Sequence, residues 1–298
     1  MCASSSTLTR CRRGSRRCIG GGAAEVIWDD GKRKAPVRVG PVGWVLVVLR
    51  AMAMVLVLVL GVLATALLRL IEQPVFGAAR PWTPWITMAV CRSALRILGL
   101  RLEVEGQMMA GHGAVVANHC SWLDILVLNA RKRVYFVAKE EVSTWPGFSV
   151  LAKITGTLFI RRDRREAARQ VVQFQERLNL GHKLLFFPEG TSSDSIRVLP
   201  FKTTLFASFF TPDLKDVSIQ PVSIVYVAPE GEDPRFYGWW GEMGMVESLV
   251  EILSRVRQGH VKLIYHTPLP VADFAGRKEL AAAAETAVRS GLERAAIN

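Results

Sequence analysis

The stretch Ala114-Val115-Val116-Ala117-Asn118-His119-Cys120-Ser121-Trp122-Leu123-Asp124 joins an apolar run to an imidazole and a carboxylate five residues apart. Residues 114–117 are apolar and partly β-branched, as in a buried strand, and Ser121 followed by Asp124 is typical of a helix start. A spacing of five does not keep two side chains on one helix face, because each residue turns by about 100°. The sequence therefore predicts a strand, a turn that carries His119, and a helix whose first turn carries Asp124.

The placement of His119 and Asp124 in this turn predicts a catalytic pair. The carboxylate of Asp124 can fold back to accept the Nδ1–H of His119, which fixes the tautomer and leaves Nε2 free to take a proton from an alcohol. An alternative interpretation is a plain capping box between Ser121 and Asp124, with a histidine that only occupies the turn.

Three later blocks extend the pattern. Gly156–Arg162 is strand-like and ends in two arginines, Phe186–Thr191 reads F-F-P-E-G-T, and Gln220–Val222 reads Q-P-V. Together with N-H-C-S-W-L-D, these blocks resemble in order and spacing the glycerolipid acyltransferase family, which includes 1-acylglycerol-3-phosphate acyltransferases. The resemblance covers about Leu100 to His266.

The resemblance implies a set of substrate-binding residues. The family carries an arginine at the position of Arg161 that faces the anionic group of the acceptor, and a guanidinium can bind phosphate or carboxylate through two oxygens. The loop F-P-E-G-T is implied to bind the head group, and Gly190 permits unusual backbone angles there. The lysines of the set also suit an exposed surface. The implied residues are Arg161, Glu189, Gly190, Thr191, Lys139 and Lys202.

The resemblance also implies the reaction. His119 would deprotonate the hydroxyl of a lysolipid, Asp124 would orient the imidazole, and the oxygen would attack the thioester of acyl-ACP or acyl-CoA. No cofactor and no metal are expected beside this co-substrate. The alternatives are a thioesterase or lysolipase that uses the same pair on water, and a non-enzymatic membrane lipid-binding module. The sequence has no G-x-S-x-G, H-E-x-x-H or G-x-x-x-x-G-K motif, which argues against lipase, metalloprotease and nucleotide hydrolase.

Two acceptors stay open. Many phosphatidate-forming members carry an arginine directly after F-P-E-G-T, where this chain has Ser192-Ser193-Asp194. The longer stretch to Lys202, with Tyr237–Gly241, is more similar to bacterial lyso-ornithine lipid acyltransferases, whose acceptor has an amino-acid head group. The candidates are therefore 1-acyl-sn-glycerol-3-phosphate and lyso-ornithine lipid, and the added carboxylate of Asp194 is expected to complement the ornithine ammonium.

The N-terminal third predicts membrane attachment. Residues 1–40 are rich in Arg, Ser and Gly without apolar periodicity, which predicts a disordered basic arm. Val42–Ile71 is almost wholly apolar and long enough to cross a membrane. Pro74, Pro81 and Pro84 are expected to end this helix, and Trp85–Leu98 is predicted to be a helix in the membrane interface.

Composition and charge support a membrane enzyme. The net charge of +12 favours anionic partners, and membrane lipids are favoured over nucleic acid because no nucleic-acid motif is present. The five cysteines form no C-x-x-C pair, so neither a disulfide framework nor a zinc site is indicated. Thioester donors are made in the cytosol, which predicts the inner (cytoplasmic) membrane with the catalytic domain facing the cytosol.

From Leu100 onward the chain alternates between strand-like and helical runs. The strand-like runs are 101–105, 113–117, 134–138, 157–160, 183–187, 217–227 and 260–265, and the helical runs are about 121–130, 164–180, 242–257 and 272–296. This alternation predicts an α/β fold with a mixed β-sheet flanked by helices. The expected division is a basic arm (1–40), membrane and interfacial helices (41–99) and an acyltransferase domain (100–298).

Overall fold

The computed structural model describes residues 28–31, 34, 38–111, 113–140, 143, 148–160, 166–214 and 216–297. Within them lies a mixed sheet of eight strands in the order β1-β7-β6-β2-β5-β3-β4, with β8 beside β6. The expected α/β fold with a mixed sheet is confirmed. The strands are β1 (Arg101–Glu105), β2 (Gly113–Ala117), β3 (Tyr135–Lys139), β4 (Leu158–Ile160), β5 (Lys183–Phe186), β6 (Ser218–Val227), β7 (His260–Tyr265) and β8 (Leu269–Pro270).

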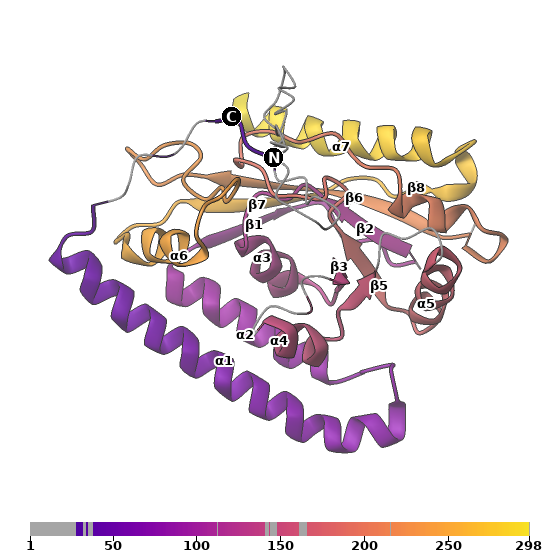
Figure 1. The fold of residues 1–298 in the computed structure, drawn as a ribbon, viewed down its shortest axis with the longest axis horizontal. Coiled ribbons are helices and arrows are strands. Elements are labelled where there is room, and N and C mark those ends of the chain that lie inside the picture. Colours follow the sequence, from indigo (N-terminus) through magenta and orange to yellow (C-terminus); the bar gives the residue numbers. More distant parts are fainter. Residues whose placement is uncertain are drawn as a thin grey trace, which may run out of the picture.

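Helices cover both faces of this sheet. Helix α7 lies along one face, whereas α2, α3 and α6 lie on the other with α1 outside them (Figure 1). The helices are α1 (Pro41–Phe76), α2 (Thr83–Leu98), α3 (Leu123–Arg131), α4 (Phe148–Thr155), α5 (Ala167–Asn179), α6 (Met245–Ser254) and α7 (Arg277–Ile297), with 3₁₀ turns at Leu205–Phe210, Pro212–Leu214 and Val271–Asp273.

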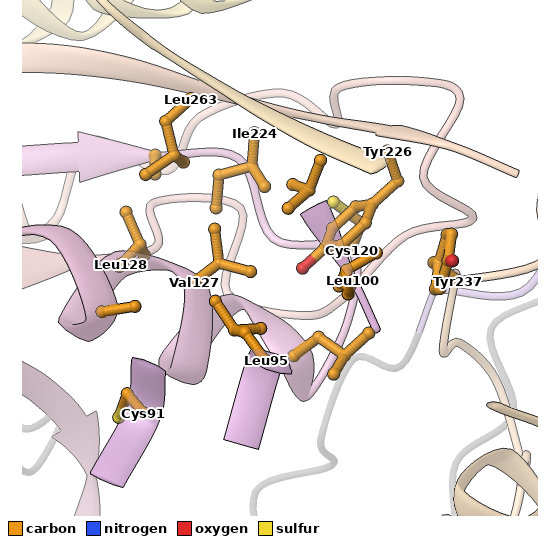
Figure 2. Packing of buried hydrophobic residues seen from close by; sticks show 14 of the residues in the cluster. Cys91, Leu95, Leu100, Cys120, Val127, Leu128, Ile224, Tyr226, Tyr237 and Leu263 are labelled. Atoms are coloured by element: carbon orange, nitrogen blue, oxygen red, sulfur yellow. The ribbon is translucent and has the colours of Figure 1, made fainter. Parts of the chain in front are cut away.

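Strand β2 lies at the centre and is buried along its whole length. Val115 and Ala117 pack into the core beneath α2 and α3, and Ala114 and Val116 pack into the core on the α7 side. Figure 2 shows the first of these cores, where side chains of α2 and α3 meet those of β6 and β7. A strand covered on both faces is apolar at successive positions, which explains the short run before Asn118.

Helix α1 is the one helix of the described residues that is long and apolar enough to cross a membrane, with a mean hydropathy of 2.8 over its most apolar 18 residues. It packs against α2, α4 and α6. The guanidinium of Arg50 donates to the carbonyls of Leu253 and Arg255. The expected break at Pro74 is wrong, because α1 continues to Phe76. Proline near the last turn removes only one backbone hydrogen bond.

Helix α2 lies between α1 and α3. Its buried side includes Met88, Cys91, Leu95 and Leu98, so much of its apolar surface faces protein, and its position in a membrane interface stays a prediction. The buried carboxylate of Glu72 accepts the N–H groups at the start of α2, which joins the two helices.

Part of the N-terminal arm is folded onto the domain. Residues 1–27, most of the expected disordered arm, lie outside the described residues. Trp28–Gly31 and Lys34, together called the strap, are described and in contact with the domain. The Lys34 side chain is only 7% exposed and lies 3.5 Å from the carboxylate of Glu251 in α6. The strap therefore differs from the expected disordered arm, because the Trp28 ring and the buried Lys34 ammonium contact the domain.

Candidate active site

Strands β6, β2, β5, β3 and β4 are adjacent and mutually parallel. Their carboxyl ends therefore meet at one edge of the sheet, where sites of open α/β sheets form. His119 follows β2, Glu189 follows β5, and Lys139 is the last residue of β3. Arg161 directly follows β4 in sequence but lies outside the described residues.

His119 and Asp124 are in contact. Nδ1 of His119 is 2.8 Å from Oδ2 of Asp124, and because a carboxylate only accepts, Nδ1 carries the hydrogen. The histidine side chain is 21% exposed, whereas the aspartate side chain is fully buried. Nε2 has no hydrogen-bond partner among the described residues, so its lone pair faces the open side of the turn.

The same carboxylate also orders the start of α3. Oδ2 of Asp124 accepts the backbone N–H groups of Cys120 at 2.9 Å and Ser121 at 3.1 Å, and the Ser121 hydroxyl accepts the N–H of Leu123. The capping interpretation and the catalytic interpretation are thus compatible. The cap fixes the backbone of the turn, and the turn aims the imidazole at Asp124.

The His119 ring and backbone are held by the F-P-E-G-T loop. The imidazole stacks on Phe187 at a centroid distance of 4.1 Å and an interplanar angle of 12°. Oε1 of Glu189 accepts the backbone N–H of His119, and Oε2 accepts that of Leu199, both at 2.7 Å. Both carboxylate oxygens of Glu189 therefore accept backbone hydrogen bonds, and the bond from His119 joins this loop to the turn that carries His119. The expected contact of Glu189 with the head group stays a prediction.

Burial raises the pKa of Glu189 to about 8, against the lowering effect of the hydrogen bonds from His119 and Leu199. With a folded-state pKa above the ordinary 4.5, its contribution to stability is complete below about pH 4.5 and is lost as pH rises through about 8. The free energy of unfolding should therefore fall over this window, with a slope of up to about 1.4 kcal/mol per pH unit.

The measurement is urea unfolding of the detergent-solubilised protein at intervals from pH 4.5 to 8.5. Glu189→Gln should flatten this dependence, whereas Glu247→Gln, at an exposed position in the first turn of α6, should leave it unchanged. Equal slopes in Glu189→Gln and wild type would show that this carboxyl titrates in the same range in both states.

The loop after Thr191 contacts the strap. The hydroxyl oxygen of Thr191 accepts the backbone N–H of Trp28 at 3.5 Å, and the guanidinium of Arg197 lies 5.1 Å from the centre of the Trp28 ring. Nη2 of Arg197 is 3.8 Å from Asp30 and 2.8 Å from Asp194. Both signs of charge thus lie beside this loop.

Asp194 is fully buried and paired with Arg197. Its expected role as a free carboxylate facing the ornithine ammonium does not fit this geometry, because the side chain already has a cation partner. Gly190 has φ of 72°, the left-handed region that glycine adopts without strain. The backbone N–H of Lys202 donates to the Pro188 carbonyl at 2.8 Å, so Lys202 lies next to the loop.

Two positioning residues escaped the sequence interpretation. The hydroxyl of Tyr226, on β6, donates to Oδ1 of Asp124 at 2.8 Å. The side-chain amide of Asn118 bonds both backbone groups of Ile224, its oxygen to the N–H and its nitrogen to the carbonyl. Asn118 thereby fixes the end of β2 against β6. Asn118 directly precedes His119 in the sequence, but no local pattern predicts that its side chain bonds Ile224.

Tyr226→Phe should lower the free energy of unfolding by about 1.5–3 kcal/mol, because a hydrogen bond to a carboxylate is lost. Turnover should fall by up to about tenfold, because Asp124 then loses one of the bonds that hold it in place beside His119. Tyr237→Phe is the matched control, since this buried phenol bonds Gln258 instead. Equal turnover in Tyr226→Phe and Tyr237→Phe would reduce Tyr226 to a packing role.

Comparisons with known proteins identify the family. A family model described as Acyltransferase matches residues 101–225. The lyso-ornithine lipid O-acyltransferase of Rhodobacter capsulatus is 57% identical over 245 residues, which cover 82% of this chain and 89% of that protein. That of Brucella abortus is 36% identical, over 68% of this chain and 80% of that protein. The crystal structure of the 1-acyl-sn-glycerophosphate acyltransferase from Thermotoga maritima has the same fold, with a TM-score of 0.62 and 21% identity over 86% of this chain and 98% of that one. The chain belongs to the acyltransferase family.

Proposed function

We propose that this protein transfers a fatty acyl group from acyl-ACP or acyl-CoA to the hydroxyl of a lysolipid, with lyso-ornithine lipid as the preferred acceptor and 1-acyl-sn-glycerol-3-phosphate as the alternative. The observation that carries the proposal is the His119–Asp124 contact, which leaves Nε2 of the imidazole open on the exposed side. A general base must reach the proton that it removes, and this nitrogen is the one group of the pair that can do so.

The reaction needs only these two side chains and the co-substrate. Nε2 of His119 takes the hydroxyl proton as the lysolipid oxygen attacks the thioester carbonyl. The carbon–sulfur bond then breaks, and the imidazolium returns the proton to the leaving thiolate. Asp124 stays ionised and stabilises the imidazolium. No covalent acyl-enzyme, cofactor or metal takes part.

The acceptor choice rests on two observations. Relatives from Rhodobacter capsulatus and Brucella abortus carry the name lyso-ornithine lipid O-acyltransferase, and Ser192 stands directly after F-P-E-G-T, where many phosphatidate-forming members carry an arginine. An ornithine head group has one carboxylate and one ammonium, so it needs fewer cations from the protein than a phosphate dianion does. Arg161, Lys139 and Lys202 are proposed to add cations for the carboxylate.

Membrane attachment through α1 would bring the catalytic domain to its lipid acceptors. We place the enzyme in the inner (cytoplasmic) membrane with its catalytic domain in the cytosol, where acyl thioesters are made. The apolar length of α1 and its packing against the domain support attachment by this helix.

The test is a lipid product analysis of the purified full chain with labelled acyl-ACP or acyl-CoA and each of the two acceptors. Labelled ornithine lipid as the main product supports the proposal, and phosphatidic acid as the main product would assign the alternative acceptor. Release of free fatty acid at the same rate with and without acceptor would identify a thioesterase. The control is His119→Ala, which should form neither lipid.

A further inference from the structure

A cavity lies at the edge of the sheet opposite to His119. Its volume is about 440 Å³, and it is lined by residues at the amino ends of the parallel strands, including Tyr135 at the start of β3 and Lys183 at the start of β5. Strand β2 separates the two edges by its five residues, or roughly 16 Å at about 3.3 Å per residue. The acceptor hydroxyl at His119 and an occupant of this cavity therefore belong to different sites.

Basic side chains dominate this cavity. Its lining includes Arg80, Lys132, Arg133, His182 and Lys183, and no acidic residue. None of the four lysine and arginine side chains makes an ion pair with a carboxylate in the described part of the chain. Nζ of Lys183 donates to the carbonyls of Ala110 and Gly111 at 3.3 and 2.9 Å, and Arg80 donates to those of Lys153 and Ile154.

These basic groups repel one another. Burial lowers the pKa of Lys183, and the nearby charges of Arg133 and Lys132 lower it further. Burial likewise lowers the pKa of His182 to about 4, with smaller contributions from neighbouring arginines. An anion in the cavity would relieve this repulsion and give the cations a partner of opposite charge.

The cavity wall also includes a buried histidine, His182, with one ring nitrogen that has no hydrogen-bond partner among the described residues. His182 is 5% exposed, its Nε2 lies 2.9 Å from the carbonyl of Ala79, and its Nδ1 has no hydrogen-bond partner among the described residues. The ring is held in place by stacking on Tyr135 at 4.0 Å. Arg80 has φ of 49°, which is uncommon outside glycine. Because Nε2 donates to the Ala79 carbonyl, the free Nδ1 can only accept, so His182 shapes the cavity wall and the lysines and arginines would hold the anion.

The cavity adjoins the membrane-facing part of the protein. Ala79 and Arg80 lie in the turn between α1 and α2, between the exposed aromatic residues Phe76 and Trp82. The guanidinium of Arg133 lies 5.2 Å from the centre of the exposed Trp85 ring. Exposed aromatic rings at the end of an apolar helix are typical of the head-group region of a bilayer, where lipid phosphates are the abundant anions.

We propose that this cavity is a phosphate-binding site, occupied by the head group of an anionic membrane lipid and separate from the catalytic centre. Arg133 and Lys132 contact the phosphate from the exposed side, and Lys183 and Arg80 contact it from within. The bound lipid fastens the α1–α2 turn to the amino edge of the sheet.

The experiment measures thermal unfolding of the purified full chain in micelles of a non-ionic detergent. Phosphatidylglycerol, phosphatidylcholine and inorganic phosphate are titrated separately into the wild type, the Lys132→Gln/Arg133→Gln variant and the Arg277→Gln/Lys278→Gln variant. The last variant removes two exposed cations of α7 and matches the change in charge. Because a ligand of the folded state raises the melting temperature with its concentration, the titrations give apparent dissociation constants.

Phosphatidylglycerol should stabilise the wild type and the α7 control equally, and its apparent dissociation constant should rise at least about tenfold in Lys132→Gln/Arg133→Gln. Stabilisation by inorganic phosphate with the same dependence on these two residues would also support the site, with free phosphate as its ligand. Equal responses in all three proteins, or no response to either phosphate source, would overturn the proposal. Turnover with lyso-ornithine lipid in micelles without added phospholipid should be unchanged by Lys132→Gln/Arg133→Gln, which separates this outcome from a failure of the proposed reaction.

Discussion

Replacement of His119 by alanine is expected to lower acyl-transfer turnover by about 10²–10⁴-fold, the usual contribution of a general base, while the protein stays folded. Folding should survive because the backbone N–H of His119 still donates to Glu189, and Asp124 keeps its bonds from Cys120, Ser121 and Tyr226. The measurement is the initial rate with labelled donor and lysolipid, beside a thermal unfolding curve.

A chemical rescue distinguishes catalysis from structure in this variant. The His119 side chain is partly exposed and stacks on Phe187, so alanine leaves a gap that free imidazole can enter. Imidazole in the assay should restore part of the rate in His119→Ala and leave the wild-type rate unchanged. Near-normal turnover of a well-folded His119→Ala protein without imidazole would end the general-base proposal and revive the membrane lipid-binding interpretation.

The change Asp124→Asn is expected to reduce both turnover and stability. This fully buried carboxylate accepts four hydrogen bonds from nitrogen and hydroxyl donors, those of His119, Cys120, Ser121 and Tyr226. An asparagine amide has one nitrogen that only donates, so at least one buried donor loses its partner, which costs about 1–3 kcal/mol. Turnover should fall somewhat less than in His119→Ala, because the asparagine oxygen can still orient the imidazole.

Urea unfolding and steady-state kinetics on the same preparation separate the two effects. Asp233→Asn is the matched control, because this carboxylate pairs with Arg235 at the surface. Surface pairs contribute little, so this variant should match the wild type within about 1 kcal/mol and in turnover. An Asp124→Asn protein with wild-type turnover would show that the carboxylate serves only as the cap of α3.

Short-range patterns predicted the local part of the site. His119 and Asp124 lie five residues apart, so the strand end, the turn and the helix start determine their contact. The strands β1, β2 and β7 begin and end as expected, and β2 is an apolar run that starts at a glycine and ends before Asn118. The roles of the substrate-binding residues stay predictions, and that of Asp194 had to be revised.

Long-range contacts were beyond the sequence patterns. Tyr226 is 102 residues from Asp124, and only the parallel pairing of β2 with β6 brings the phenol to the carboxylate. A buried tyrosine in an apolar strand is an ordinary core residue by every local criterion. Helix α4 was missed because it is only eight residues long, which is too short for a clear helical period.

The strap acts as an intramolecular ligand of the loop after β5. Its individual contacts are modest: a 3.5 Å hydrogen bond from Trp28 to Thr191, and a 3.8 Å approach of Asp30 to Arg197. The short connection to α1, which begins at Pro41, keeps these groups near the loop, and a short tether gives an effective concentration in the millimolar range. A free peptide with the sequence of residues 28–34 would therefore need to be present at about millimolar concentration to replace the attached strap.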